Sequence, residues 1–213
     1  MGIISKGILG GFSGTVGTVV GGTWKGIDYM RSQATRRTNN PSQKQLEQQA
    51  KFGLAIKFVQ PLNGLFMLTF RNFAVEKTGI NSALSYVLQN AITGTYPSYS
   101  IDYPNVLVSR GDLPNVLNPA AAAAAGNTVK FDWTDNSGTG KAKASDKAVL
   151  VVYSPADKLA LYTTGSALRS AGTENFAVSI FAGQTVETYI GFISEDGREI
   201  ATSIYTGQVT VAP

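Results

Sequence analysis

The sequence predicts an α+β protein that is mainly β, and three observations support this prediction. The stretch from Gly2 to Gly26 holds nine of the 23 glycines, mixed with large apolar residues. Residues 41–91 repeat apolar side chains with the period of a helix, and from residue 105 the period changes to two. We therefore expect a Gly-rich arm, a β-hairpin and helices over residues 1–104, followed by a β-sandwich over residues 105–213.

The opening stretch combines two properties that usually exclude each other. Glycine inside an element loses much conformational entropy and packs no side chain, so the stretch is a poor independent structure. It is also too apolar for a flexible linker of the Gly/Ser kind. We expect it to be ordered only where another backbone lies close against it.

Two strands are expected next, residues 15–20 and 23–30, on either side of Gly21-Gly22. Paired glycines between β-formers indicate a hairpin turn, because primed turns need positive φ. Neither face of residues 23–30 is cleanly apolar, and an isolated hairpin is marginal in water. These strands therefore need a sheet supplied by this chain or by another.

Helices follow the hairpin. The Asn-Pro-Ser step at residues 40–42 is a typical helix start, and the apolar stripe predicts a helix over 41–59. Residues 62–77 are aromatic-rich and fit a helix or a strand, and a further helix is expected over 80–91. The Tyr/Pro-rich residues 94–104 are predicted to connect two domains.

The C-terminal half is a series of short β segments separated by turns, which is typical of a sandwich. Asp196-Gly197 predicts a tight hairpin between the last two strands. The six alanines 120–125 are too few to hold a helix alone, so we expect a connector there. The expected strands are residues 106–110, 127–134, 146–154, 158–163, 174–181, 186–194 and 199–211.

Two aromatic residues strengthen the sandwich prediction. Trp133 lies on an early strand and Tyr189 on the penultimate one, and the half has no cysteine. This pattern resembles a fibronectin type III or related immunoglobulin-like domain. The resemblance implies an immunoglobulin-like β-sandwich and no particular activity.

The first 60 residues resemble an uncharacterised family of Bacteroidota proteins. The resemblance is carried by GFSGTVGTVVGGTWKGIDYMRS and, further on, NPSQKQLEQQAKFGL. That family pairs a glycine-rich start and a W-K-G step with an N-P-x-[ST]-x-x-Q helix start. The resemblance implies a domain of unknown function and supplies no catalytic residues.

Composition excludes several chemistries. The chain has no cysteine and no histidine, so thiol nucleophiles, His triads and thiolate or imidazole metal sites are absent. The glycines at 10–14 lack the context of a phosphate loop. Asp132, Asp135 and Asp146 could bind Ca²⁺ through oxygen, but solvated loop charges explain them better. We expect no enzyme activity, no cofactor and no metal.

Assembly is the function that we expect. Only 15% of the residues are charged, and a low charged share favours a protein that hides surface in an assembly. We expect a structural protein that forms a filament, tube or virion-like particle with copies of itself and other structural proteins. The expected interface residues are Gly10, Gly11, Phe12, Gly14, Val16, Gly17, Val19, Val20 and Trp24.

Two alternatives remain open. One is a glycan- or protein-binding module that uses the sandwich loops. The other, which we rank lowest, is association with nucleic acid or another polyanion through Lys25, Arg31, Arg36 and Arg37. We find no recognisable signal peptide and no apolar run of about 20 residues. We therefore expect no membrane span and cytoplasmic synthesis, with an extracellular or virion assembly as a possible end point.

Overall fold

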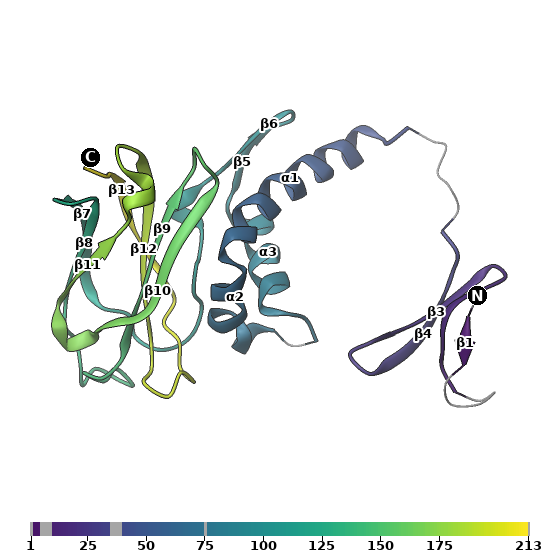
Figure 1. Cartoon of the computed structure of the whole chain (residues 1–213), viewed down its shortest axis with the longest axis horizontal. Coiled ribbons are helices and arrows are strands. Elements are labelled where there is room, and N and C mark those ends of the chain that lie inside the picture. The colour runs from purple at the N-terminus through teal and green to yellow at the C-terminus, as the bar shows by residue number, and fades with distance from the viewer. Residues whose placement is uncertain (1, 5–9, 35–39, 75, 213) are drawn as a thin grey trace. The chain divides into compact units, whose positions relative to one another are not determined.

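The computed structural model describes residues 2–4, 10–34, 40–74 and 76–212 (Figure 1). The chain forms two compact units, residues 1–42 and residues 43–213, which we call the N-terminal and the C-terminal unit. The predicted division lay at residue 104. The structure divides the chain earlier because the helices after residue 43 share a core with the sandwich.

The N-terminal unit is an antiparallel sheet in the order β1-β2-β3-β4. Its strands are β1 (Ile3–Ile4), β2 (Phe12–Val16), β3 (Val19–Trp24) and β4 (Ile27–Ser32). A hairpin turn at Gly21-Gly22 was expected, and that prediction was wrong. The turn between β3 and β4 is Lys25-Gly26, where both φ angles are positive, 49° and 82°. This is the signature of a type I′ turn.

The helices form as the periodicity predicts. They are α1 (Gln43–Val59), α2 (Asn63–Thr69) and α3 (Gly79–Asn90), which confirms the expected helices 41–59 and 80–91 within two residues. The aromatic-rich stretch is helical up to Thr69 and ends in a 3₁₀ turn, Arg71–Phe73. The predicted connector 94–104 instead contains the hairpin β5 (Ile92–Thr95) and β6 (Ser98–Ile101).

The sandwich consists of two antiparallel sheets, in the orders β10-β9-β12-β13 and β11-β8-β7. This arrangement of seven strands confirms the predicted immunoglobulin-like sandwich. The four-stranded sheet contains β9 (Lys147–Ser154), β10 (Leu159–Leu168), β12 (Thr185–Ile193) and β13 (Ile204–Thr210), and the three-stranded sheet contains β7 (Leu117–Ala124), β8 (Thr128–Thr134) and β11 (Thr173–Ala177).

Two local predictions in this half were wrong. The alanine run was expected to be a connector, but five of its residues belong to β7, where Ala120–Ala124 pair with β8. Residues 106–110 were expected to be a strand, yet they are irregular. Their backbone is held by a side chain instead, because Ser203 Oγ accepts hydrogen bonds from the N–H groups of Val108 (2.9 Å) and Ser109 (3.3 Å).

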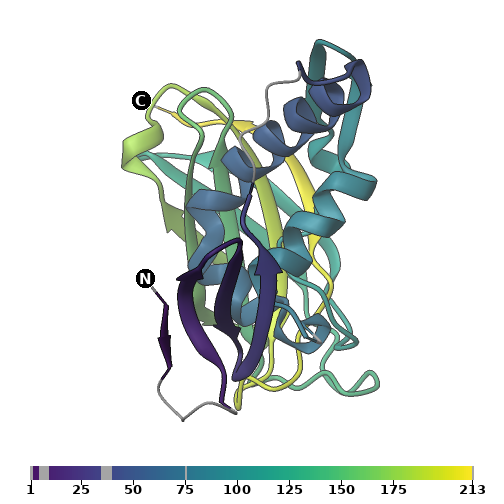
Figure 2. The same ribbon diagram turned by 90° about the vertical axis from the view of Figure 1, so that its right-hand side faces the viewer.

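The two central strands of the four-stranded sheet, β9 and β12, are buried on both faces. Alternate residues of β9, such as Leu150 and Val152, pack into the core between the two sheets. Their neighbours Val149, Val151 and Tyr153 pack against the helices. Within the C-terminal unit, α1–α3 lie over one face of this sheet (Figure 2). Strand β9 therefore reads as a continuous apolar run, residues 148–153, rather than as an alternating one.

The helical run Gln43–Thr69 is long and apolar enough to cross a membrane by length and composition. Part of its apolar surface is buried: Phe58, Leu62 and Phe66 are fully buried in the core that the helices share with the sheet. Phe52 and Met67, in contrast, are 47% and 54% exposed. The core of this unit thus accounts for part of the apolar character of the run.

Candidate assembly surface

The N-terminal unit has almost no interior. Among those of its residues whose burial is described, only Gly21 is buried, and large apolar side chains are exposed to solvent. Trp24 is 57% exposed, and Ile27 and Met30 are each 71% exposed. A sheet normally buries at least one face against another layer. This one has no such layer within the described part of the unit.

Glycines set the shape of this sheet. Gly14 adopts a positive φ of 101° in β2. A side chain at Gly21 would overlap the backbone of Phe12, and one at Gly11 would overlap the carboxylate of Asp28. The backbone at Gly11 and Phe12 therefore lies directly on β3 and β4, at a distance that only glycine permits.

No described residue of this unit covers the opposite side of the hairpin. Register pairs Trp24 with Ile27 and Val20 with Arg31, while Tyr29 pairs with Gly22 and lies against it. These five side chains, Val20, Trp24, Ile27, Tyr29 and Arg31, share one face, because paired residues of antiparallel strands point to the same side. We call it the aromatic face.

Within the described residues, strand β4 also offers a free edge. It is the last strand of its sheet there, and all six of its residues are exposed. The residues that flank a two-residue turn form a hydrogen-bonded pair, so Ile27, Tyr29 and Arg31 direct their peptide groups toward β3. The next odd-numbered residue follows the same pattern, because Gln33 N donates a hydrogen bond to Thr18 O (2.7 Å), just before β3. Asp28, Met30 and Ser32 therefore direct their N–H and C=O groups outward.

All nine residues predicted to form an interface belong to this one unit. Phe12, Gly14 and Val16 are in β2, Val19, Val20 and Trp24 are in β3, Gly17 is in a turn, and Gly10 and Gly11 precede β2. Sequence reasoning missed the exposed residues of β4. The mixed character of both faces of residues 23–30 was the available signal, since a strand without a clean apolar face often lies at an edge.

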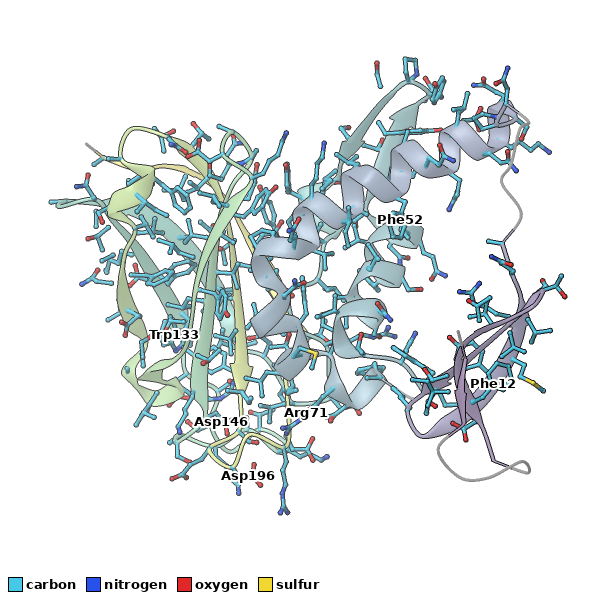
Figure 3. The ribbon with its side chains drawn as sticks, turned by 45° about the vertical axis from the view of Figure 1, so that its right-hand side comes forward. Phe12, Phe52, Arg71, Trp133, Asp146 and Asp196 are labelled. Atoms are coloured by element: carbon cyan, nitrogen blue, oxygen red, sulfur yellow. The ribbon has the colours of Figure 1, made fainter. Side chains whose placement is uncertain are left out.

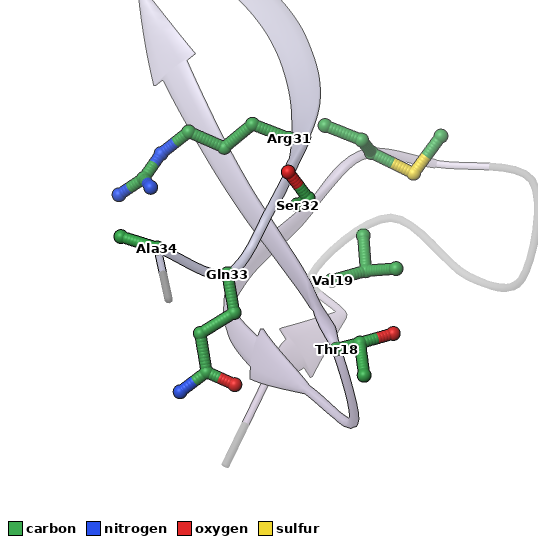
Figure 4. A pocket seen from close by; sticks show the side chains of 7 residues that line it. Thr18, Val19, Arg31, Ser32, Gln33 and Ala34 are labelled. Atoms are coloured by element: carbon green, nitrogen blue, oxygen red, sulfur yellow. The ribbon is translucent and has the colours of Figure 1, made fainter. Parts of the chain in front are cut away.

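The cations predicted to contact a polyanion are only partly described. Lys25 lies in the β3–β4 turn and Arg31 on β4, and both are exposed. Arg36 and Arg37 lie outside the described residues. Arg31 also lines an open hollow of about 850 Å³ with Val19, Met30 and Gln33 at the end of the hairpin (Figure 4).

A separate groove of about 530 Å³ lies on the C-terminal unit. Its walls come from α1, from β6 and from the loop between β9 and β10, and include Lys57, Tyr99, Tyr103 and Lys158. Burial, together with the nearby Glu187 carboxylate, raises the pKa of Tyr103 above its usual value. The groove therefore presents the protonated phenol of Tyr103 beside two cations.

The three aspartates considered for Ca²⁺ do not form a common site. Asp146 is fully buried, and its Oδ2 accepts from Arg169 Nε (3.1 Å) and from Lys143 N (2.8 Å). Hydrogen bonds from Ser137 hold the pKa of Asp135 below its usual value. Hydrogen bonding to Lys130 does the same for Asp132. No group of metal-ligating side chains occurs among the described residues.

Asp146 was expected to be a solvated loop charge, which was wrong. It is one half of a buried ion pair at the end of the sandwich where the turn with Asp196 also lies (Figure 3). Arg169 also donates to Asn136 Oδ1 (2.6 Å) and Pro114 O (2.9 Å). Its guanidinium lies 4.6 Å from the ring centroid of Phe192. Arg169 thus links the β8–β9 loop, which holds Asn136 and Asp146, to the segment before β7, which holds Pro114, an arrangement that serves stability.

The fold and its surface define a class: an immunoglobulin-like sandwich covered by helices and preceded by a small exposed sheet. The chain belongs to a family described as a family of unknown function (DUF6266), which matches residues 11–207. No curated protein matches the sequence.

Two solved structures that contain fibronectin type III domains are similar to part of this chain. The FN1–FN3 domains of chicken CNTN1 are 10% identical, with a TM-score of 0.38, over 49% of this chain and 36% of that chain. The fn3 domain of the human collagen alpha-1(XX) chain is 13% identical, with a TM-score of 0.34, over 49% of this chain and 91% of that chain.

Proposed function

We propose that this is a structural protein that associates with copies of itself through its N-terminal unit, building a filament, tube or particle. One observation carries the proposal: the described part of the unit exposes seven large apolar side chains and buries only Gly21. A unit of about 40 residues without disulfide, metal or core usually needs a partner to be stable. A second copy is the simplest partner that covers this surface.

The choice of a protein surface over a lipid or polyanion partner rests on the mixture of groups. The aromatic face combines Trp24, Ile27 and Tyr29 with one cation, Arg31. Aromatic residues and arginine are the residues enriched at protein interfaces. The adjacent free edge of β4 adds main-chain donors and acceptors, which suit strand addition.

The test compares the full chain with a variant that lacks residues 1–42. The remaining residues 43–213 form a compact unit with two cores of their own, so we expect them to stay folded. Light scattering should give a multiple of the chain mass for the full chain and the monomer mass for the variant. Negative-stain microscopy then shows whether the larger species is regular.

Point variants test whether association depends on this surface in particular or on any exposed apolar residue. Replacing Trp24 and Ile27 together by serine should lower the mass of the full chain. Replacing Ile180, which is 56% exposed on the C-terminal unit, by serine is the matched control and should leave it unchanged. A full chain that is monomeric at high concentration would refute the proposal.

The groove on the C-terminal unit supports a second candidate function, a glycan- or protein-binding module. Pockets that bind small ligands combine apolar walls with a few polar groups, and this groove has tyrosines beside Lys57 and Lys158. Binding of a panel of neutral and acidic oligosaccharides to the full chain, lost on Tyr99→Ala, would favour it. No binding in that panel would remove the glycan form of this candidate.

A further inference from the structure

The free edge of β4 is complementary to itself. We propose that two copies of this chain pair antiparallel through β4, with Met30 of one copy opposite Met30 of the other. The inference rests on the proposed self-association and specifies one contact within it: which strand pairs, in which register and with which symmetry. A twofold contact closes at a dimer, so a filament or particle needs a further contact between such dimers.

The two edges of the sheet differ in their capacity to pair. β1, at one edge, comprises two of the described residues, and short strands are one way in which proteins blunt an edge. β4, at the other edge, has six exposed residues and contains neither proline nor glycine. An edge of this kind is a template for another strand.

Symmetry restricts the possible registers. Two identical edges that pair antiparallel are related by a twofold axis perpendicular to the sheet, which carries each face into itself. The aromatic face of one copy thus continues into the aromatic face of the other. Even-numbered residues can only lie opposite even-numbered ones, and odd-numbered residues opposite odd-numbered ones.

Hydrogen bonding then selects one register. Asp28, Met30 and Ser32 carry the outward peptide groups. With Met30 opposite Met30, Asp28 faces Ser32 on both sides of the axis, so all three residues form hydrogen-bonded pairs. With Tyr29 opposite Tyr29, only Asp28 and Met30 pair within the strands, and Ser32 lies beyond the end.

The same register brings matching side chains together. On the aromatic face, Tyr29 lies opposite Arg31 twice, in the closer, non-hydrogen-bonded pairs. Arginine over a tyrosine ring gains a cation–π interaction. On the other face, the Asp28 carboxylate, which already accepts from Thr23 Oγ1 (2.6 Å), faces the Ser32 hydroxyl. The alternative register would place Asp28 opposite Met30 and Ile27 opposite Arg31.

The absence of cysteine from this chain makes thiol cross-linking a clean test. Residues of a hydrogen-bonded pair have Cα atoms about 5.5 Å apart, which a disulfide spans. Met30→Cys in the full chain should therefore give a covalent dimer with oxidised glutathione. Tyr29→Cys places its two thiols on a diagonal, with Cα atoms about 7–8 Å apart, beyond disulfide reach. Glu195→Cys, on an exposed turn of the C-terminal unit, reports random collision.

The expected result is that Met30→Cys cross-links at least about tenfold faster than the other two variants, because pairing raises the effective concentration of its thiols. Faster cross-linking of Tyr29→Cys would overturn the register. Equal rates for all three, with a mass that still drops on deletion of residues 1–42, would overturn the β4 contact and leave the proposed function standing. An unchanged mass after that deletion would refute the proposed function itself.

Discussion

Replacing Arg169 by methionine should destabilise the sandwich more than almost any other single change. The guanidinium is fully buried, pairs with the buried Asp146 and donates to Asn136 and Pro114. Methionine keeps much of the volume but leaves the carboxylate buried without a cation. Breaking a buried pair from one side costs about 3–5 kcal/mol, a large share of the roughly 5–15 kcal/mol that stabilises a domain.

A second variant isolates the charge. In Arg169→Met/Asp146→Asn the uncompensated carboxylate is gone. What is lost is the ion pair and the hydrogen bonds of the guanidinium to Asn136 and Pro114. We therefore expect the double variant to be more stable than Arg169→Met alone by about 2 kcal/mol. If the two substitutions acted independently, their losses of stability would add, and the double variant would be less stable than Arg169→Met alone.

Tryptophan fluorescence in urea measures both variants. The chain has two tryptophans, so a Trp24→Phe background leaves Trp133, whose Nε1 donates to the Arg169 carbonyl (2.8 Å), as the reporter. A loss of 3–5 kcal/mol moves the urea midpoint down by on the order of 1–3 M. A loss below about 1 kcal/mol for Arg169→Met, or a double variant less stable than the single one, would refute the reasoning.

Two further predictions concern the C-terminal unit. A side chain on Gly191 would approach Ser109 Oγ to 2.6 Å, and that hydroxyl donates to Ala201 O (2.8 Å). Gly191→Ala should therefore cost about 1–3 kcal/mol in urea unfolding, and adding Ser109→Gly should recover part of it; no recovery would refute the steric cause. Burial raises the pKa of Tyr153, so the folded state keeps a proton that the unfolded state loses above about pH 10. Stability should fall as pH rises above 10, by up to about 1.4 kcal/mol per pH unit for this group, and Tyr153→Phe should show a shallower fall between pH 9 and 11.5; an unchanged slope would contradict the assignment.

Local signals predicted most elements of this fold. The helices and most sandwich strands follow from apolar periodicity, which depends only on neighbouring residues. The β3–β4 turn was misplaced because Gly21-Gly22 is a strong turn signal on its own. In the structure these glycines lie within β3 and permit close contacts with Phe12 of β2 and Tyr29 of β4. This need for glycine arises only once the fold has brought these strands together.

Long-range pairing also explains the other misses. The alanines of β7 have no β preference and are held by their register with β8. Arg169 and Asp146 are 23 positions apart, and no spacing rule links them. The apolar character of the Gly-rich opening indicated surface that needs a partner. It could not show that β4, rather than the opening itself, carries the free edge.

The order of the elements along the chain determines how long the helices remain uncovered during synthesis. The apolar sides of α1 and α2 pack against a sheet whose second central strand, β12, ends only at Ile193. A ribosome that adds about 5–20 residues per second needs roughly 6–25 s to travel from the end of α2 to the end of β12. During that interval the nascent helices have no sheet to cover them. Chaperones that bind apolar helices on the ribosome therefore have a defined window in which to act on this protein.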